Sequence, residues 1–315
     1  MTFNNLFFKA SIATEAAAVA CADWIGKGDN NGADQAAVNA MRKALRTLPI
    51  DGEVVIGEGE RDKAPMLYIG EKINGGDLPV DIAIDPLEGT NLCANGVGNA
   101  ITVMAIGQKN TLLKAPDVYM NKIAIGISSD KKIIDINASI KDNVQSLAKF
   151  KKCAQSELKA VVLKRKRHSY IIAELRQLGV RVQLIDDGDI LGVIATTTSE
   201  ADLYMGIGGA PEGVLAAAAL KCLGGQMQCK LIFEHEKQIQ RAVIMGIKEP
   251  STVYHINDMV KGDVVFCATG VTDGILLRGV KKSPQSIDTH SFITSYSLQK
   301  NSQLITSHHY NKVLK

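Results

Sequence analysis

The sequence predicts an α/β fold in which helices cover β-sheets, and two observations support this prediction. Between residues 161 and 223, short apolar strands alternate with helical stretches, an order typical of α/β layers. Aromatic residues make up only 5% of the 315 residues, so small and aliphatic side chains must form most of the core. At roughly 150 residues per domain the chain can hold two halves. We expect these halves at 1–155 and 156–315, because a basic stretch near residue 155 resembles a seam.

The first half is expected to begin with helices and to continue with buried strands. Apolar residues recur at helical spacing over residues 6–25 and 35–48, and Asp34 stands at the N-cap position of the second stretch. Short apolar runs predict strands, and amphipathic spacing predicts one further helix. The strands are expected at 54–56, 80–84, 100–105 and 122–126, and the helix at 140–150.

The second half is expected to alternate strand and helix. The strands are predicted at 161–163, 180–185 and 203–205, and the helices that follow them at 168–178, 190–196 and 212–223. A further helix is expected at 234–245. Residues 287–310 are typical of a hairpin that turns near Lys300 and Asn301.

Charge and cysteine content argue against several classes of protein. The 36 Lys and Arg residues nearly balance 33 Asp and Glu residues, so we expect no nucleic-acid partner and no membrane partner. The six cysteines include no C-x-x-C pair, which favours reduced thiols over disulfides or a zinc site. The apolar run 214–220 is far shorter than the roughly 20 residues of a membrane span, and Lys9 and Glu15 interrupt the apolar N-terminal segment. We therefore expect a cytoplasmic protein.

Carboxylates at strand ends are the main chemical signal. Asp85 and Glu88 follow the second expected strand, and Glu58 follows the first. On a tight turn Asp85 and Glu88 can converge on one cation, and oxygen-only ligands select Mg²⁺ or Mn²⁺ over zinc. Gly89 and Thr90 offer backbone N–H groups and a hydroxyl that suit a phosphate or an attacking water. The alternative is an ordinary polar turn.

A glycine-rich segment, 206–213, follows one expected strand and opens an expected helix. Pro211 fits the first helical turn, and Glu212 lies beside the positive end of the helix dipole. Glu212 can therefore be a functional group or can merely complement the dipole. The segment lacks the third glycine of a dinucleotide fingerprint, and the sequence contains no P-loop.

The basic run 164–168 lies at an expected junction between strand and helix. Arginine binds phosphate through two parallel hydrogen bonds and lysine adds a point charge, so the run is either an anion site or a solvated face. Both interpretations stay open, because a basic run is usually a solvated face whereas ligands of α/β folds gather at strand ends. The run Asp187-Gly188-Asp189 also follows a strand, and it can bind sugar hydroxyls or serve as a turn or helix cap.

Several segments together resemble the class II fructose-1,6-bisphosphatases along nearly the whole chain. The segments are V-V-I-G-E-G-E-R-D-K-A-P-M-L-Y-I-G-E (54–71), D-I-A-I-D-P-L-E-G-T (81–90), A-P-D-V-Y-M-N-K (115–122), Gly28-Asp29 through Asp34, Arg167-His168, D-G-D and G-I-G-G-A-P-E-G. The D-P-x-E-G-T pattern alone would indicate only the wider superfamily of metal-dependent, lithium-sensitive sugar and inositol phosphatases. The resemblance implies an α/β/α/β/α layered sandwich of the sugar-phosphatase type. It also implies hydrolysis of the 1-phosphate of fructose 1,6-bisphosphate, to give fructose 6-phosphate in gluconeogenesis.

The resemblance further implies roles for individual residues. Two divalent cations, Mn²⁺ or Mg²⁺, would be held by five carboxylates: Asp34 and Glu58 for one, and Asp85, Glu88 and Glu212 for the other. Thr90 would position the attacking water and help to deprotonate it, with Asp62 as an assistant. The substrate contacts would be Glu88, Gly89, Thr90, Tyr119, Arg165, Lys166, Arg167, Asp187, Gly188, Asp189 and Gly209.

Two positions depart from the family pattern. Asn30 stands where members of the family tend to have lysine, and Lys166 replaces the proline of a K-P-R-H segment. Neither change removes a proposed ligand, so rate and substrate preference are the properties that they put in question.

Three alternatives stay open. The same machinery can act on sedoheptulose 1,7-bisphosphate or an inositol phosphate, the chain can be a sugar-phosphate-binding regulator without catalysis, or residues 149–167 can bind nucleic acid. The near-neutral charge makes the last the weakest. We expect a small sugar bisphosphate as partner and a homo-oligomer, a dimer or tetramer, as the assembly.

Overall fold

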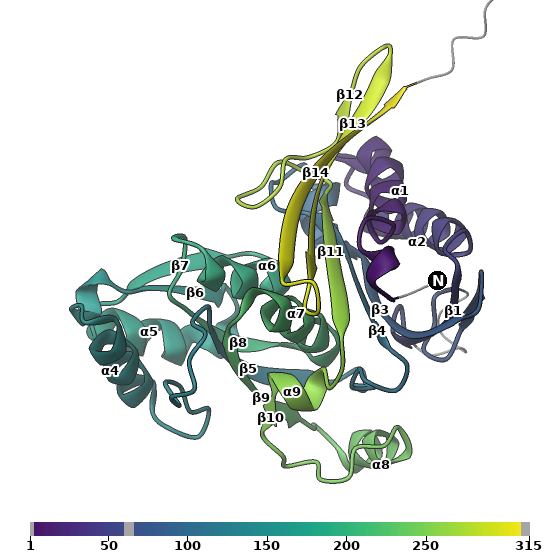
Figure 1. Cartoon of the computed structure of the whole chain (residues 1–315). Helices are drawn as coiled ribbons and strands as arrows, with labels where there is room; N and C mark the ends of the chain where they lie inside the picture. Colours follow the sequence, from purple (N-terminus) through teal and green to yellow (C-terminus); the bar gives the residue numbers. More distant parts are fainter. Residues whose placement is uncertain (1–2, 60–65, 310–315) are drawn as a thin grey trace, which may run out of the picture. The chain divides into compact units, whose positions relative to one another are not determined.

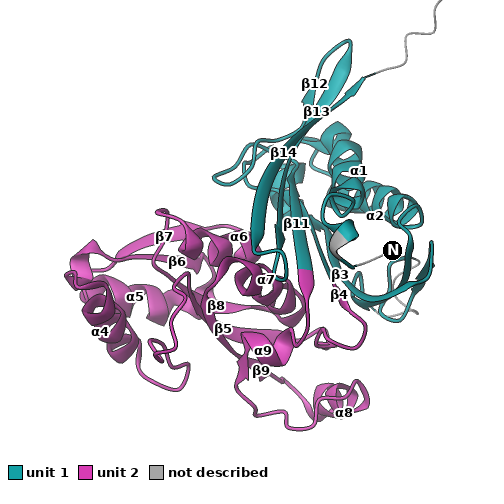
Figure 2. Ribbon diagram, viewed as in Figure 1, with its two compact units in different colours: residues 1–106, 265–315 teal, residues 107–264 magenta. Residues whose placement is uncertain are grey.

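Two sheets form the framework of the residues that the computed structural model describes, 3–59 and 66–309 (Figure 1). The chain divides into two compact units, which Figure 2 distinguishes by colour. Unit 1 contains residues 1–106 and 265–315, and unit 2 contains residues 107–264. The halves expected at 1–155 and 156–315 do not coincide with these units, because the last long strands of the chain belong to the sheet of unit 1.

Unit 1 is built on an eight-stranded sheet in the order β12-β13-β11-β4-β3-β1-β2, with β14 paired to β13. The strands are β1 (Ile50–Ile56), β2 (Lys72–Asn74), β3 (Leu78–Glu88), β4 (Ile101–Gln108), β11 (Val264–Gly270), β12 (Lys281–Lys282), β13 (Ser286–Ser295) and β14 (Lys300–His309). β1 and β3 run parallel, whereas β13 runs antiparallel to both β11 and β14. Helices α1 (Ser11–Cys21) and α2 (Asn30–Leu45) pack on each other and on β3. Buried alanines on both helices allow this close approach.

Unit 2 is built on a six-stranded sheet in the order β10-β9-β5-β8-β6-β7. The strands are β5 (Tyr119–Ile125), β6 (Lys159–Leu163), β7 (Arg181–Ile185), β8 (Leu203–Gly209), β9 (Gln226–Ile232) and β10 (Tyr254–His255). The helices are α4 (Ile140–Lys151), α5 (Ser169–Gln177), α6 (Asp189–Ile194), α7 (Ala210–Leu223), α8 (Glu236–Ile244) and α9 (Ile256–Met259). Side chains of α4 and α5 form one hydrophobic core with alternate residues of β5, β6 and β8. β6 runs parallel to β7 and β8, while β5 runs antiparallel to β8 and β9.

The predicted α/β class is confirmed, and most of the expected elements lie within a few residues of their predicted positions. The hairpin at the end of the chain is also confirmed, with Ser295 and Lys300 as the partners that flank its turn. Five strands had no counterpart in the predictions: β2, β9, β10, β11 and β12. Among the described residues, no helix combines the length and the apolar character that crossing a membrane requires.

Two expected boundaries were wrong. Helix α2 begins at Asn30, because Asp29 rather than Asp34 is its N-cap: Oδ1 of Asp29 accepts a hydrogen bond from the Gly32 N–H at 2.8 Å. Strand β3 does not end at residue 84 but continues to Glu88. Asp85 and Glu88 therefore belong to the end of a strand rather than to a turn after it.

Candidate active site

The end of β3 carries a pair of carboxylates in unit 1. A carboxylate oxygen of Asp85 lies within 4.8 Å of one of Glu88, and Glu88 is only 6% exposed. The Leu87 N–H donates a hydrogen bond to Oδ1 of Asp85 at 3.0 Å, which holds the Asp85 side chain against its own strand. Two carboxylates at this separation form an oxygen donor set of the kind that Mg²⁺ and Mn²⁺ prefer. The acidic pair therefore fits divalent cation binding.

Gly89 connects this pair to a short helix, α3 (Thr90–Ala94). Its φ of 84° lies in the left-handed region, which glycine adopts without steric cost, and an added Cβ would lie 2.9 Å from the Leu92 side chain. Thr90 is therefore the first residue of α3, half-buried and separated from the carboxylate pair by a single glycine.

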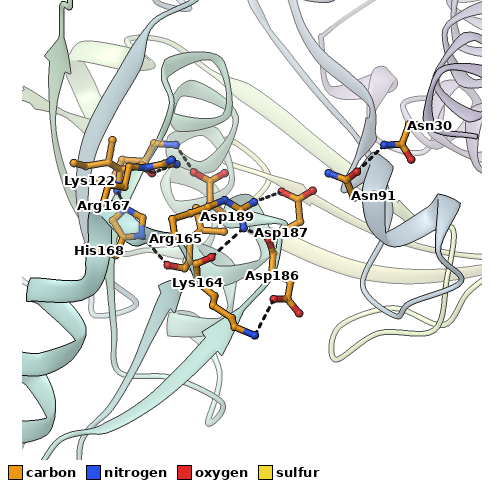
Figure 3. A network of polar contacts seen from close by, with 12 residues as sticks. Asn30, Asn91, Lys122, Lys164, Arg165, Arg167, His168, Asp186, Asp187 and Asp189 are labelled. Atoms are coloured by element: carbon orange, nitrogen blue, oxygen red, sulfur yellow. Dashed lines mark hydrogen bonds and ion pairs between the residues drawn. The ribbon is translucent and has the colours of Figure 1, made fainter. Parts of the chain in front are cut away.

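Asn30 contacts the same short helix. Its Nδ2 donates a hydrogen bond to Oδ1 of Asn91 at 2.6 Å (Figure 3). Asn91 immediately follows Thr90, so a bond between two neutral amides connects the first residue of α2 to the first turn of α3.

Asp34 lies in the second turn of α2 and is half-buried. Burial raises the pKa of its carboxyl group. Burial also raises the pKa of the nearby Cys21 thiol, and the charges of Asp34 and Asp85 add to this effect. Both carboxylates therefore act on the same buried cysteine, which places Asp34 in the neighbourhood of Asp85 within unit 1.

Two further predicted residues belong to the segment after β1. Glu58 is half-buried, and its N–H donates a hydrogen bond to the Leu67 carbonyl at 3.0 Å. Asp62, the expected assistant in catalysis, lies outside the described residues.

Glu212 lies in the first turn of α7 in unit 2, with Pro211 at the start of that helix as predicted. The carboxylate folds back over the residue before the helix: an added Cβ on Gly209 would lie 2.0 Å from Oε2 of Glu212. A side chain at position 209 would therefore displace this carboxylate. The positive end of the helix dipole also favours a carboxylate here, as the alternative interpretation requires.

Arg167 and Tyr119 meet beside the end of β8. The Arg167 Cζ lies 4.8 Å from the centre of the Tyr119 ring, a cation–π contact. Nε and Nη2 of Arg167 donate hydrogen bonds to the Ile207 carbonyl at 3.1 and 2.8 Å. Tyr119 is in turn the strand partner of Gly209. Three residues predicted as substrate contacts thus lie together at one end of β5 and β8.

His168 supports this arrangement from below the surface. It is fully buried, and its Nε2 accepts a hydrogen bond from the Ile207 N–H at 2.8 Å, so Nδ1 carries the proton and donates to the Leu163 carbonyl at 2.7 Å. Burial, partly offset by these backbone bonds, lowers the pKa of His168. The neutral ring therefore ties β6 to β8 beneath Arg167.

Arg165 contacts the segment that precedes α6. Its Nη1 donates a hydrogen bond to the Asp186 carbonyl at 2.5 Å, and its Nη2 lies 3.5 Å from Oδ1 of Asp187 (Figure 3). Lys166 is exposed. The basic run and the D-G-D segment, predicted separately, are thus neighbours in unit 2.

Asp189 forms a buried ion pair that the sequence did not reveal. Its Oδ2 lies 2.5 Å from Nζ of Lys122, and the two side chains are 6% and 0% exposed. Gly188 precedes Asp189 in the left-handed region, with φ 86°. Asp189 is therefore held by the protein's own lysine, while Asp187 remains closer to the surface.

Comparisons with known proteins find similar sequences within one family. A family model described as bacterial fructose-1,6-bisphosphatase, glpX-encoded, matches residues 4–309. The chain is 44% identical to a class 2 fructose-1,6-bisphosphatase of Haemophilus influenzae, over 91% of each chain. It is also 44% identical to fructose-1,6-bisphosphatase 1 class 2 of Escherichia coli, over 92% of this chain and 91% of the relative.

A third relative has a broader name. The chain is 41% identical to a D-fructose 1,6-bisphosphatase class 2/sedoheptulose 1,7-bisphosphatase of Trichodesmium erythraeum, over 94% of this chain and 93% of the relative. A solved inositol monophosphatase–fructose 1,6-bisphosphatase aligns with 65% of this chain and 75% of its own length, at 10% identity and a TM-score of 0.36. The family match and the identities over nearly the full length show that the chain belongs to the class 2, glpX-encoded family of fructose-1,6-bisphosphatases.

Proposed function

We propose that this chain hydrolyses the 1-phosphate of fructose 1,6-bisphosphate, releasing fructose 6-phosphate and inorganic phosphate for gluconeogenesis. The match to the family over residues 4–309 carries the proposal. Two features support it: the acidic end of β3 in unit 1 and the cationic Arg165 and Arg167 in unit 2. Carboxylates can hold the divalent cations that bind the reacting phosphate, and arginines can bind the other phosphate.

The proposed metal ligands are all carboxylates. We assign Asp85, Glu88 and Glu212 to one divalent cation and Asp34 and Glu58 to a second, either Mn²⁺ or Mg²⁺. The proximity of Asp85 to Glu88 and the burial of Glu88 support the first assignment. A bound divalent cation lowers the pKa of a coordinated water and neutralises phosphate oxygens.

Thr90 is assigned to the attacking water. Its hydroxyl can accept a hydrogen bond from the water. This bond would hold the water in line for attack, on the side of the phosphorus opposite the leaving oxygen. Asp62 is proposed to assist. Glu88 and Gly89 are proposed to contact the reacting phosphate from the same strand end.

The phosphate that is not cleaved has to be held by cations. Each phosphate carries about −1.5 to −2 charges at pH 7. We assign Arg165, Lys166 and Arg167 to this phosphate together with Tyr119, whose contact with Arg167 supports a common site. We assign the sugar to Asp187, Gly188, Asp189 and Gly209. Holding the distant phosphate also orients the reacting one, which lowers the entropic part of the barrier.

Phosphate release from metal-stripped protein tests the proposal. Fructose 1,6-bisphosphate, sedoheptulose 1,7-bisphosphate and inositol 1-phosphate are each supplied with Mn²⁺, with Mg²⁺ or with neither. We expect metal-dependent release that is fastest with fructose 1,6-bisphosphate. A preference for sedoheptulose 1,7-bisphosphate would keep the mechanism and change the substrate. This compound is tested because the Trichodesmium relative is named for both substrates. A folded protein that releases phosphate from none of them refutes the proposal.

The ligand assignment has its own matched control. Asp85→Asn removes a ligand at the end of β3, while Asp77→Asn makes the same change at an exposed position just before the start of β3. We expect the first variant to fall to the rate of the metal-stripped enzyme and the second to retain activity.

A cytoplasmic location and a homo-oligomeric state stay predictions, to be checked by fractionation and by light scattering.

A further inference from the structure

Among the described lysines, Lys122 is the one that is fully buried. Its Nζ lies 2.5 Å from Oδ2 of Asp189, and the Tyr204 hydroxyl lies 3.5 Å from the same oxygen. Removing two charges from water is costly, so a pair of apolar side chains would stabilise the fold as well or better. We therefore look for its role in the position of the segment that contains Asp189, the D-G-D segment 187–189.

Two glycines leave room for this ion pair. An added Cβ on Gly208 of β8 would lie 2.1 Å from Oδ2 of Asp189 and 3.1 Å from Nζ of Lys122. An added Cβ on Gly213 of α7 would lie 3.4 Å from Cε of Lys122. β8 and α7 therefore enclose the pair closely, and the Asp189 carboxylate has little freedom to move.

The ion pair fixes one end of the D-G-D segment. Asp189 is the first residue of α6, and Gly188 before it has a positive φ, so a left-handed residue lies directly beside the anchored carboxylate. Two residues earlier, Oδ1 of Asp187 lies 3.5 Å from the Arg165 guanidinium (Figure 3). Lys122 thus holds the buried end of the segment, and Arg165 contacts its outer end.

The surroundings of Lys122 favour its charged form. Burial alone would lower the pKa of its ammonium group, but the charges of Asp189 and Glu212 outweigh burial and raise it. The protonated form of Lys122 is therefore favoured beside these carboxylates.

We propose that Lys122 is a positioning residue for substrate binding: by anchoring Asp189 it sets the place of the Asp187-Gly188 turn that contacts the sugar. The contact with sugar rests on the proposed function, whereas the anchoring does not.

A double-mutant cycle on steady-state kinetics tests the coupling. Lys122→Met keeps an unbranched side chain, one atom shorter, and removes its charge. We expect kcat/KM for fructose 1,6-bisphosphate to fall about tenfold to a hundredfold, mainly through KM. In an Asp189→Asn background the same change should cause little further loss, because Lys122 acts through Asp189. Full multiplication of the two effects, or wild-type KM in Lys122→Met, overturns the proposal.

Lys151→Met is the matched control. Lys151 pairs with Asp202, just before β8 begins and so at the opposite end of that strand, and it is partly exposed. We expect wild-type kcat and KM from this variant. Equal losses in Lys151→Met and Lys122→Met would mean that any lost ion pair of unit 2 has the same effect, and would also overturn the proposal.

Hydrogen–deuterium exchange gives a readout that does not depend on catalysis. The double variant Lys122→Met/Asp189→Asn removes both charges of the pair, so it is the variant to use where Lys122→Met alone fails to fold. We expect faster exchange over residues 185–192 in the double variant, and unchanged exchange in β1 and β3. Wild-type exchange over 185–192 refutes the anchoring. A wild-type protein that hydrolyses no sugar phosphate but shows this exchange pattern would refute only the proposed function.

Discussion

Gly208→Ala is the most direct perturbation of the buried ion pair, because it adds one methyl group and removes no polar atom. The new Cβ would lie 2.1 Å from Oδ2 of Asp189, and contacts shorter than 3.0 Å essentially never occur, so the carboxylate must move by about 1 Å. That movement stretches the 2.5 Å contact with Lys122 beyond the range of a charged hydrogen bond. Overpacking and the weakened bond together should cost about 2–4 kcal/mol of the free energy of unfolding.

Gly206→Ala is the matched control, since it makes the same change two residues earlier on the same face of β8. Its Cβ would meet His168 Cε1 at 3.3 Å, which needs a shift of only a few tenths of an ångström. Urea unfolding followed by far-ultraviolet circular dichroism measures both variants, because β8 belongs to unit 2 whereas the single tryptophan, Trp24, belongs to unit 1. A Gly208→Ala protein as stable as Gly206→Ala would refute the proposed enclosure of the ion pair.

Three other predictions concern catalysis, binding and pH. Thr90→Ala should lower kcat more than it raises KM, and an effect on KM alone in steady-state kinetics would contradict its role with the attacking water. Arg167→Ala should raise KM for fructose 1,6-bisphosphate roughly tenfold with a smaller change in kcat, because it removes a charged contact with the phosphate that is not cleaved; unchanged kinetics would make the basic run a solvated face. Burial lowers the pKa of His168 in the folded state, so the unfolded chain binds the proton more readily and stability should fall as pH drops below about 6.5 towards the folded pKa. Urea unfolding at pH 7.5 and 5.5 should show a larger loss in the wild type than in His168→Gln, and equal losses would count against this role.

The start of α2 shows why one local prediction failed. Gly32 and two asparagines are poor helix formers, and the helix was expected to begin only after Asp34. In the structure the Trp24 ring packs where a Gly32 side chain would lie, with an added Cβ only 2.1 Å from Cζ3 of the ring. Tertiary packing thus extends the helix over residues that local propensity disfavours.

The candidate site also contains residues that the sequence predicts and residues that it does not. Asp85, Glu88 and the residues after them could be predicted, because they lie so close in the sequence that their side chains can reach the same place. The role of Lys122 could not be predicted, because a lone lysine near the middle of a strand carries no local sign of burial. Its partner, Asp189, lies 67 residues further along the chain, and the two meet only because α6 packs on α7, β6 and β8 within unit 2.

Unit 2 is one continuous stretch of chain, whereas unit 1 is assembled from both sides of it. Strands β4 and β11 are neighbours in the sheet of unit 1, although more than 150 residues separate them in the sequence. During synthesis, therefore, all of unit 2 emerges from the ribosome before β11, β13 and β14 exist. Until those later strands are synthesised, the sheet of unit 1 is incomplete. The exposed apolar surface and unpaired edge of its first strands then favour aggregation. A stop codon just before β11 would consequently remove little of the sequence but would leave unit 1 without the strands that complete its sheet.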